Sequence, residues 1–87
     1  MASYELVFRK SVAKDLRALP KKDVKRIMQR ILPLAHDPRP AGCERLSSQE
    51  RYRVRQGVYR IIYEIKNDRL TVLVVKVGHR REVYRSS

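Results

Sequence analysis

Four arginines gather near the middle of the chain, with a spacing typical of one face of a β-sheet. Arg51, Arg53 and Arg55 occupy alternate positions, and Arg60 follows a few residues later. Successive side chains of a strand point to opposite faces, so the first three arginines share a face. Like charges on one face repel, and a face selected only for solubility is not expected to collect them. Because guanidinium holds phosphate in a planar fork of donors, the pattern favours phosphate binding over a merely solvated face.

A second group of polar residues follows the last apolar stretch, near the end of the chain. His79 has the side chain that most often serves as acid or base near neutral pH. Tyr84 has a ring that can stack on a nucleic-acid base. Between them lie Arg80 and Arg81. The alternative is a frayed basic terminus, since a lone histidine in such a place is more often idle than catalytic.

Glu44 precedes the arginine stretch at a predicted junction between loop and strand. A carboxylate there is a surface residue, a salt-bridge partner, or a general base held among arginines, and the first two readings are favoured. The two histidines, His36 and His79, are far apart, and Cys43 is the only cysteine. This arrangement argues against a metal site, and no glycine-rich loop suggests a cofactor.

Two helices are predicted to precede the arginine stretch. Apolar residues at helical spacing predict one helix over residues 11–19, with Ser11 as N-cap. Pro20 ends it and can begin the next helix. A second apolar stripe follows at Val24, Ile27, Met28, Ile31 and Ala35. Pro33 should kink or end this second helix early.

Alternating patterns predict the strands that carry the candidate residues. We expect strands at residues 4–9, 51–56, 58–66 and 69–77, and residues 44–46 can begin an edge strand. The 69–77 segment is apolar on both faces and is therefore predicted to be central. The fold class is α+β, with two N-terminal helices on one face of a small, mostly antiparallel sheet of about four strands. The arginines, Arg60 included, then project into solvent from the face without helices.

Composition limits the chain to few classes of protein. With 87 residues, a single domain spanning 1–87 is expected. The 21 Lys and Arg against 9 Asp and Glu give a net charge of +12, which predicts a polyanionic partner. No apolar run approaches the ~20 residues that span a bilayer, so no membrane role is expected. A single cysteine and a start without an apolar signal core predict a cytoplasmic protein.

Three segments together resemble a known family over almost the whole chain. They are "SVAKDLRALP", "YRVRQGVYRIIYEI" and "DRLTVLVVKVGHRREVY". The chain resembles the RelE branch of the RelE/ParE superfamily, the toxins of type II toxin–antitoxin pairs. The resemblance implies an endoribonuclease that cleaves mRNA in the ribosomal A site. The ribose 2′-hydroxyl attacks the adjacent phosphate, without a metal or other cofactor.

The resemblance also implies roles for particular residues. Family positions that act in catalysis match Arg53, Arg55, Arg60, Arg80 and Tyr84, and the nearest matches to a Glu base and a His acid are Glu44 and His79. RNA binding is expected to extend to Arg51, Arg81 and Arg85. The family often has lysines where this chain has Arg53 and Arg55. Arginine stays charged and is a poor proton acceptor. Glu44 is therefore a stronger candidate for the general base than either arginine.

The resemblance implies partners as well. They are a cognate antitoxin, mRNA on the ribosome, and operator DNA only through the antitoxin complex. Two other functions stay open at this point. One is a ParE-like gyrase poison, a binding protein without nuclease activity, although ParE proteins generally lack the arginine and tyrosine set. The other is a plain nucleic-acid-binding corepressor.

Overall fold

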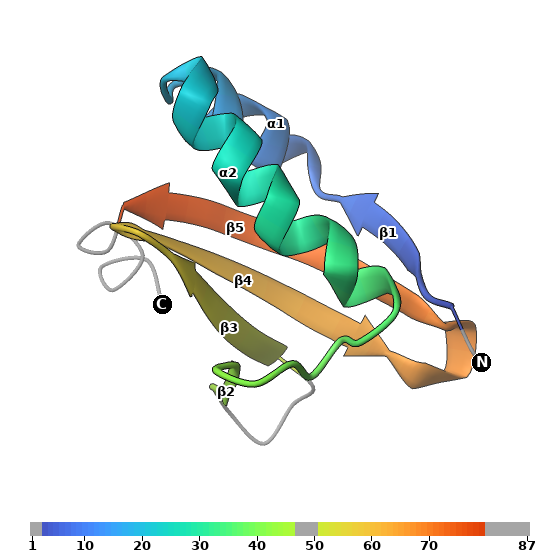
Figure 1. Cartoon of the computed structure of the whole chain (residues 1–87). Helices are drawn as coiled ribbons and strands as arrows, with labels where there is room; N and C mark the ends of the chain where they lie inside the picture. Colours follow the sequence, from blue (N-terminus) through green and yellow to red (C-terminus); the bar gives the residue numbers. More distant parts are fainter. Residues whose placement is uncertain (1–2, 47–50, 80–87) are drawn as a thin grey trace.

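One sheet with two helices on a single face makes up the computed structural model, which describes residues 3–46 and 51–79 (Figure 1). This arrangement confirms the predicted α+β class. The helices are α1 (Lys10–Arg17) and α2 (Lys21–Ile31), with short 3₁₀ turns at Leu32–Ala35 and Asn67–Arg69. The strands are β1 (Glu5–Phe8), β2 (Glu44–Arg45), β3 (Arg51–Gln56), β4 (Tyr59–Lys66) and β5 (Thr71–His79).

The sheet has five strands in the order β1-β5-β4-β3-β2, one more than the expected four or so. The fifth strand is β2, the edge strand that residues 44–46 were expected to begin; it has two residues and pairs with β3. β1 pairs in parallel with β5, whereas the other neighbours are antiparallel. With β1 on one side and β4 on the other, β5 is central, as its apolar pattern predicts.

The prolines set the ends of the second helix, as expected. Pro20 is the N-cap of α2, and Asp23 in the first turn has the charge that a helix N-terminus favours. The α-helix ends at Ile31, and the chain continues through Pro33 as a 3₁₀ turn. Pro33 has no N–H for an α-helical hydrogen bond. The N-cap prediction for α1 was wrong: Arg9 holds that position without a side-chain cap, and Ser11 lies inside the helix.

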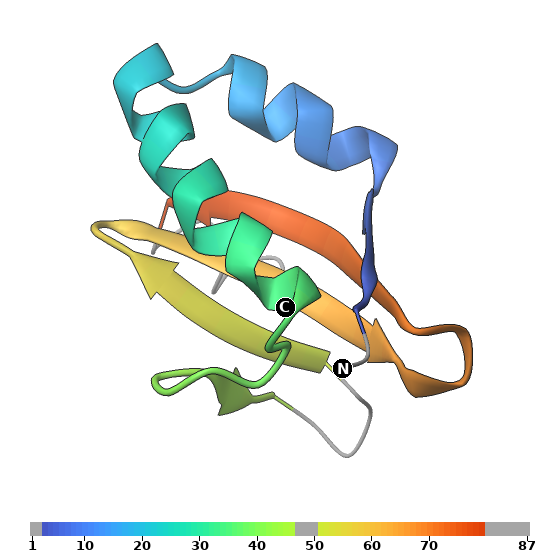
Figure 2. The same cartoon turned by 45° about the vertical axis from the view of Figure 1, so that its right-hand side comes forward.

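The main core lies between the helices and the sheet (Figure 2). The helical segments contribute Val12, Ile27, Ile31 and Leu34, and the sheet contributes Tyr52, Val54, Ile61, Tyr63, Ile65, Val72, Val74 and Val77. Burying an apolar side chain of this size contributes about 1.5–3 kcal/mol. Tyr63 is fully buried, and its hydroxyl donates a hydrogen bond to the Pro38 carbonyl oxygen at 2.6 Å. Burial raises the pKa of the Tyr63 hydroxyl, so this donor stays protonated.

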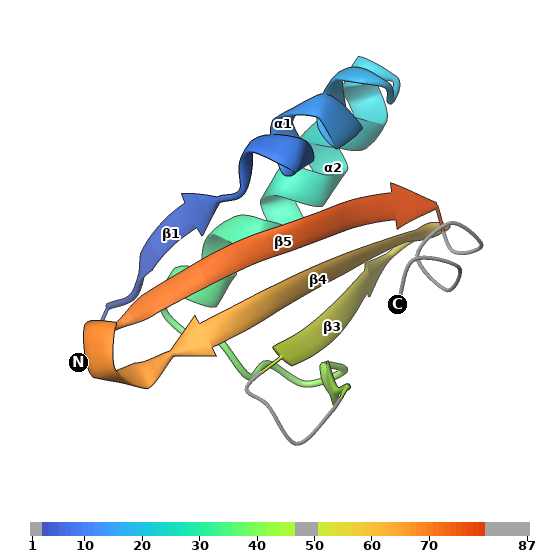
Figure 3. The same cartoon turned by 180° about the vertical axis from the view of Figure 1, so that it is seen from behind.

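The opposite face of the sheet carries no helix in the described part of the chain. Seen from behind, β5 passes in front of α2 (Figure 3). A β-bulge interrupts the pairing of β4 with β5 at Ile62 and Tyr63, and Val75 lies on this second face. There Val75 and Ile62 form a small apolar cluster with Leu46 and Leu73. None of the described helices has the length and apolar character needed to cross a bilayer.

Candidate nucleic-acid interface

The arginine row of β3 lies on the helix-free face of the sheet, as its alternation predicts. Tyr52 and Val54 are buried under the helices, so Arg51, Arg53 and Arg55 point the other way. Across the β3–β4 ladder these arginines face Glu64, Ile62 and Arg60, respectively. Register therefore places Arg60 beside the row, directly across from Arg55 near the hairpin turn. Four guanidinium groups belong to one face of two adjacent strands.

Burial differs sharply among these arginines. The Arg53 side chain is 11% exposed and that of Arg55 is 57% exposed. Arg60 is only 2% exposed, so the expectation that it projects freely into solvent was wrong. Its partner on β5 is Gly78, which has no side chain to occupy the neighbouring position on this face. Alternation gives the face on which a side chain lies, but it does not give the depth at which neighbours enclose it.

Two carboxylates neutralise part of the arginine row. Glu44, directly across from Arg53 in the β2–β3 ladder, pairs with Arg53 through Oε2. Its Oε1 lies 3.8 Å from Nη2 of Arg55. Glu44 therefore lies among the arginines as a salt-bridge partner, one of the readings favoured from the sequence.

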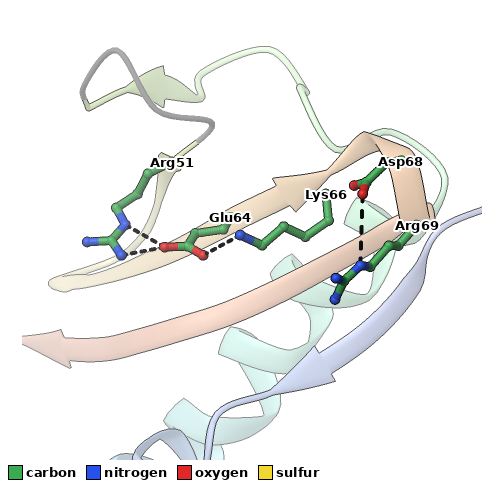
Figure 4. Close-up of polar contacts among 5 residues, drawn as sticks. All are labelled: Arg51, Glu64, Lys66, Asp68 and Arg69. Atoms are coloured by element: carbon green, nitrogen blue, oxygen red, sulfur yellow. Dashed lines mark hydrogen bonds and ion pairs between the residues drawn. The ribbon is translucent and has the colours of Figure 1, made fainter.

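Glu64 holds the other end of the row (Figure 4). It accepts a hydrogen bond from Nε of Arg51 at 3.1 Å and a second from Nη2 of the same guanidinium. On its other side lies Nζ of Lys66, 3.1 Å from Oε1. Burial by itself raises the pKa of Glu64, but the hydrogen bonds from Arg51 and Lys66 outweigh it and hold the pKa below its ordinary value. The even spacing of Glu64 from Arg60 and Ile62 predicts that it lies on this face, but the sequence interpretation did not include it among the candidate site residues.

His79 lies apart from the arginine row. It pairs with Tyr59 at the end of β5, and the two rings meet edge to face with centroids 6.3 Å apart. Tyr59 belongs to the helix-covered side, where its hydroxyl donates a 2.7 Å hydrogen bond to Asp23 of α2. This hydrogen bond, together with burial, raises the pKa of Tyr59. The structure thus brings together Arg51, Arg53, Arg55, Arg60 and Glu44, and it does not bring His79 to them.

Four other candidate residues lie outside the described residues: Arg80, Arg81, Tyr84 and Arg85. Within residues 3–46 and 51–79, no group of three His, Cys, Asp or Glu side chains is placed to hold a metal ion. The chemistry available on the described face is therefore that of preorganised cations beside carboxylates. Such a surface binds phosphate and stabilises negative charge that develops on it.

Comparison with known families identifies the class of protein to which this fold belongs. The family model for the ParE toxin of type II toxin–antitoxin systems matches residues 6–84. The putative toxin RelE1 of Methanocaldococcus jannaschii is 31% identical over 87 aligned residues, covering 95% of this chain and 97% of the relative. The chain belongs to the RelE/ParE superfamily of type II toxins, as its sequence motifs predict, and it is RelE-like.

Two further relatives support this assignment. Toxin RelG of Mycobacterium tuberculosis is 27% identical over 84 residues, covering 94% of this chain and 97% of RelG. The archaeal RelE–RelB complex from Pyrococcus horikoshii contains a chain that is 27% identical, with a TM-score of 0.81. That match covers 90% of this chain and 96% of the archaeal one. The likeness extends over the whole toxin domain.

Proposed function

We propose that this chain is a ribosome-dependent endoribonuclease that cleaves mRNA in the A site. The observation that carries the proposal is the convergence of Arg53, Arg55 and Arg60 on one helix-free sheet face. When a 2′-hydroxyl attacks the adjacent phosphate, negative charge builds on the non-bridging oxygens. One well-placed donor stabilises such charge by about 2.7–4 kcal/mol. The attacking oxygen belongs to the RNA itself, so the reaction requires no metal or other cofactor.

The pairing of like charges supports a phosphate ligand. Arg55 and Arg60 face each other across the β3–β4 ladder, so two like charges occupy neighbouring positions of one face. A phosphate bound at this position would accept hydrogen bonds from both guanidinium groups. A face selected only for contact with water has no such reason to keep the pair.

Each remaining candidate has a proposed role. Arg51, Arg81 and Arg85 would bind the RNA backbone on either side of the scissile phosphate. Arg80 would join the transition-state donors, and Tyr84 would stack on the base beside the cut. Glu44, which pairs with Arg53 and lies beside Arg55, is the candidate carboxylate placed among these arginines. Since His79 contacts Tyr59 on the other side of the sheet, we do not assign it the role of acid.

The open face explains why cleavage would need the ribosome. A flat sheet surface cannot by itself hold a single strand bent for in-line attack, and single-stranded bases must be splayed to be recognised. In the A site, mRNA is already held in a defined path. The chain would then act in the cytoplasm, where the ribosomes are. The toxin would supply the cationic groups that stabilise the reacting phosphate, and the ribosome would hold the mRNA in position.

An antitoxin is the proposed protein partner. The Pyrococcus horikoshii relative was solved as a complex of RelE with RelB. Between α1 and α2 this chain has an apolar groove of about 490 Å³ with Leu16, Leu19 and Val24 on its floor. Arg17, Lys21 and Lys25 also line it, which fits an acidic amphipathic segment that folds on binding. Operator DNA would be reached only through that antitoxin.

One rival function has a specific observation in its favour. The family model that matches residues 6–84 is named for ParE toxins. A ParE-like chain would be a gyrase poison without nuclease activity. The arginine row favours the nuclease, because a protein that only binds another protein has no need to gather phosphate donors on one face. A corepressor that only binds nucleic acid would likewise leave mRNA intact.

The test is to add the chain to a translating extract, map the 5′ ends of the mRNA, and assay gyrase supercoiling in parallel. We expect cuts at codons in the A site, upstream fragments that end in a 2′,3′-cyclic phosphate or 3′-phosphate, and unchanged supercoiling. A 2′-O-methyl group at the scissile nucleotide should abolish cutting, because it removes the nucleophile. Inhibition of gyrase with intact mRNA would establish the rival. Cutting of naked RNA that requires added metal would overturn the mechanism.

A further inference from the structure

Glu44 places an anion of the protein itself in the middle of the arginine row. Its carboxylate pairs with Arg53 through one oxygen and lies 3.8 Å from Nη2 of Arg55 at the other. Two guanidinium groups thus face one small anion through two oxygens. This is the arrangement in which arginines hold a phosphate. The carboxylate stands in for two of the phosphate oxygens.

The two sides of this ion pair differ in how firmly they are held. The Arg53 side chain is 11% exposed, so the packing around it fixes its position. The Glu44 side chain is 54% exposed and belongs to β2, a two-residue strand at the edge of the sheet. Rotation of Glu44 into solvent breaks little packing, whereas movement of Arg53 breaks much more. Arg53 is therefore held in position by packing, whereas the Glu44 carboxylate can turn away into solvent.

Burial leaves Arg53 short of acceptors even with Glu44 in place. Its Nε is buried and has no hydrogen-bond partner, while its Nη2 is occupied by Glu44. A phosphodiester carries the same single negative charge as a carboxylate, on two non-bridging oxygens, and its ester oxygens can accept further hydrogen bonds. An incoming phosphodiester can therefore engage this guanidinium at least as well as Glu44 does.

We propose that Glu44 is a displaceable internal anion, which occupies the phosphate position between Arg53 and Arg55 until RNA replaces it. The inference rests on the proposed function in one respect, that RNA phosphate is the ligand of this face. Glu44 then lowers the affinity of the free toxin for any RNA backbone. This loss of affinity is overcome on the ribosome, which holds the mRNA phosphate beside the arginines. This role differs from that of a general base, which would affect the rate of cleavage and leave binding unchanged.

Binding of an uncleavable RNA tests the role of Glu44 directly. The probe is a fluorescent single-stranded oligoribonucleotide with 2′-O-methyl groups throughout, titrated with the full-length chain and followed by anisotropy. Glu44→Gln keeps the size of the side chain and removes its charge. Two exposed ion pairs are lost, so we expect binding about three- to tenfold tighter than wild type. Thermal melts of each variant verify folding.

The matched control is Glu5→Gln. Glu5 is an exposed residue of β1, at the opposite edge of the sheet from β2. Both variants raise the net charge by one, so any general electrostatic gain appears equally in both. We expect Glu5→Gln to bind close to wild type. Equal affinities of Glu44→Gln and Glu5→Gln would overturn the proposal.

Single-turnover cleavage on programmed ribosomes separates this inference from the proposed function. With saturating toxin, Glu44→Gln should cut at least as fast as wild type, because the displaced group takes no part in the chemistry. Unchanged binding with cleavage about 10²-fold slower would identify Glu44 as a base and overturn the inference. If wild type itself leaves ribosome-bound mRNA intact, the proposed nuclease fails. The anisotropy comparison still decides whether Glu44 competes with phosphate.

Discussion

Arg55 on β3 and Arg60 on β4 are direct cross-strand partners, yet one side chain is 57% exposed and the other is almost wholly buried. The guanidinium group of Arg60 is therefore enclosed by the surrounding structure, whereas that of Arg55 is accessible to solvent. Preorganisation of this kind is what transition-state stabilisation requires, since donors that are already oriented need no rearrangement during the reaction. The burial of Arg60 also changes what its substitution should do to stability.

Arg60→Ala should destabilise the fold. Removing most of a buried side chain typically costs about 0.5–3 kcal/mol. For a domain of this size each kcal/mol lowers the melting temperature by about 4–8 °C. Thermal melts followed by circular dichroism measure the change. Arg55→Ala is the matched control and should stay within about 0.5 kcal/mol of wild type. Identical melting temperatures for the two variants would contradict the burial of Arg60.

Arg60→Met separates the charge of this residue from its packing. Methionine is long, flexible and apolar, so it can fill the space of the buried stem and keep the chain folded. If Arg60 stabilises the charge on the phosphate, single-turnover cleavage on ribosomes should slow by about 10²–10³-fold. The same substitution at Arg69, whose side chain is 79% exposed in the β4–β5 turn, should leave the rate unchanged. Wild-type cleavage by a folded Arg60→Met variant would remove Arg60 from the proposed mechanism.

His79→Ala should cleave ribosome-bound mRNA at a rate close to that of wild type. In the structure His79 contacts Tyr59 on the helix-covered side, away from the arginine row. We expect a change within about threefold, compared with the loss of about 10²–10⁴-fold that removal of a general acid causes. The pH–rate profile should also keep its shape. A large loss, with a changed profile between pH 5 and 8, would show that His79 turns to the open face during the reaction.

Glu64→Gln should remove a part of the stability that depends on pH. Arg51 and Lys66 hold the pKa of Glu64 below its unfolded value of 4.5, so ionised Glu64 favours the folded state. This contribution is fully present above pH 4.5 and is lost as the pH falls through the lower pKa of the folded state. Wild type should therefore exceed Glu64→Gln in free energy of unfolding at pH 7, with a smaller difference at pH 3. Urea titrations at both values provide the measurement. The opposite trend would mean that burial dominates the pKa of Glu64.

The sequence by itself determined the elements and the faces of this protein. Period-two alternation in residues 51–56 assigned Tyr52 and Val54 to the core and the arginines to the other face, because successive side chains of a strand point in opposite directions. Pro20 marks the start of α2, where a missing N–H costs nothing and its fixed φ suits the position, and Pro33 ends the helix because it lacks an N–H. Family motifs along the chain identified the RelE/ParE superfamily. Each of these inferences depends either on residues that are close together in the sequence or on motifs that related proteins share.

Only the tertiary structure decided which residues meet and how deeply each is buried. Register between strands set Glu44 across from Arg53 and Glu64 across from Arg51, and no local pattern contains that alignment. The parallel pairing of β1 with β5 joins segments from opposite ends of the described chain. Arg60 is buried, and His79 meets the ring of Tyr59 from the neighbouring strand β4. Periodicity reports the direction of a side chain, whereas its partners and its exposure depend on contacts between segments far apart in the sequence.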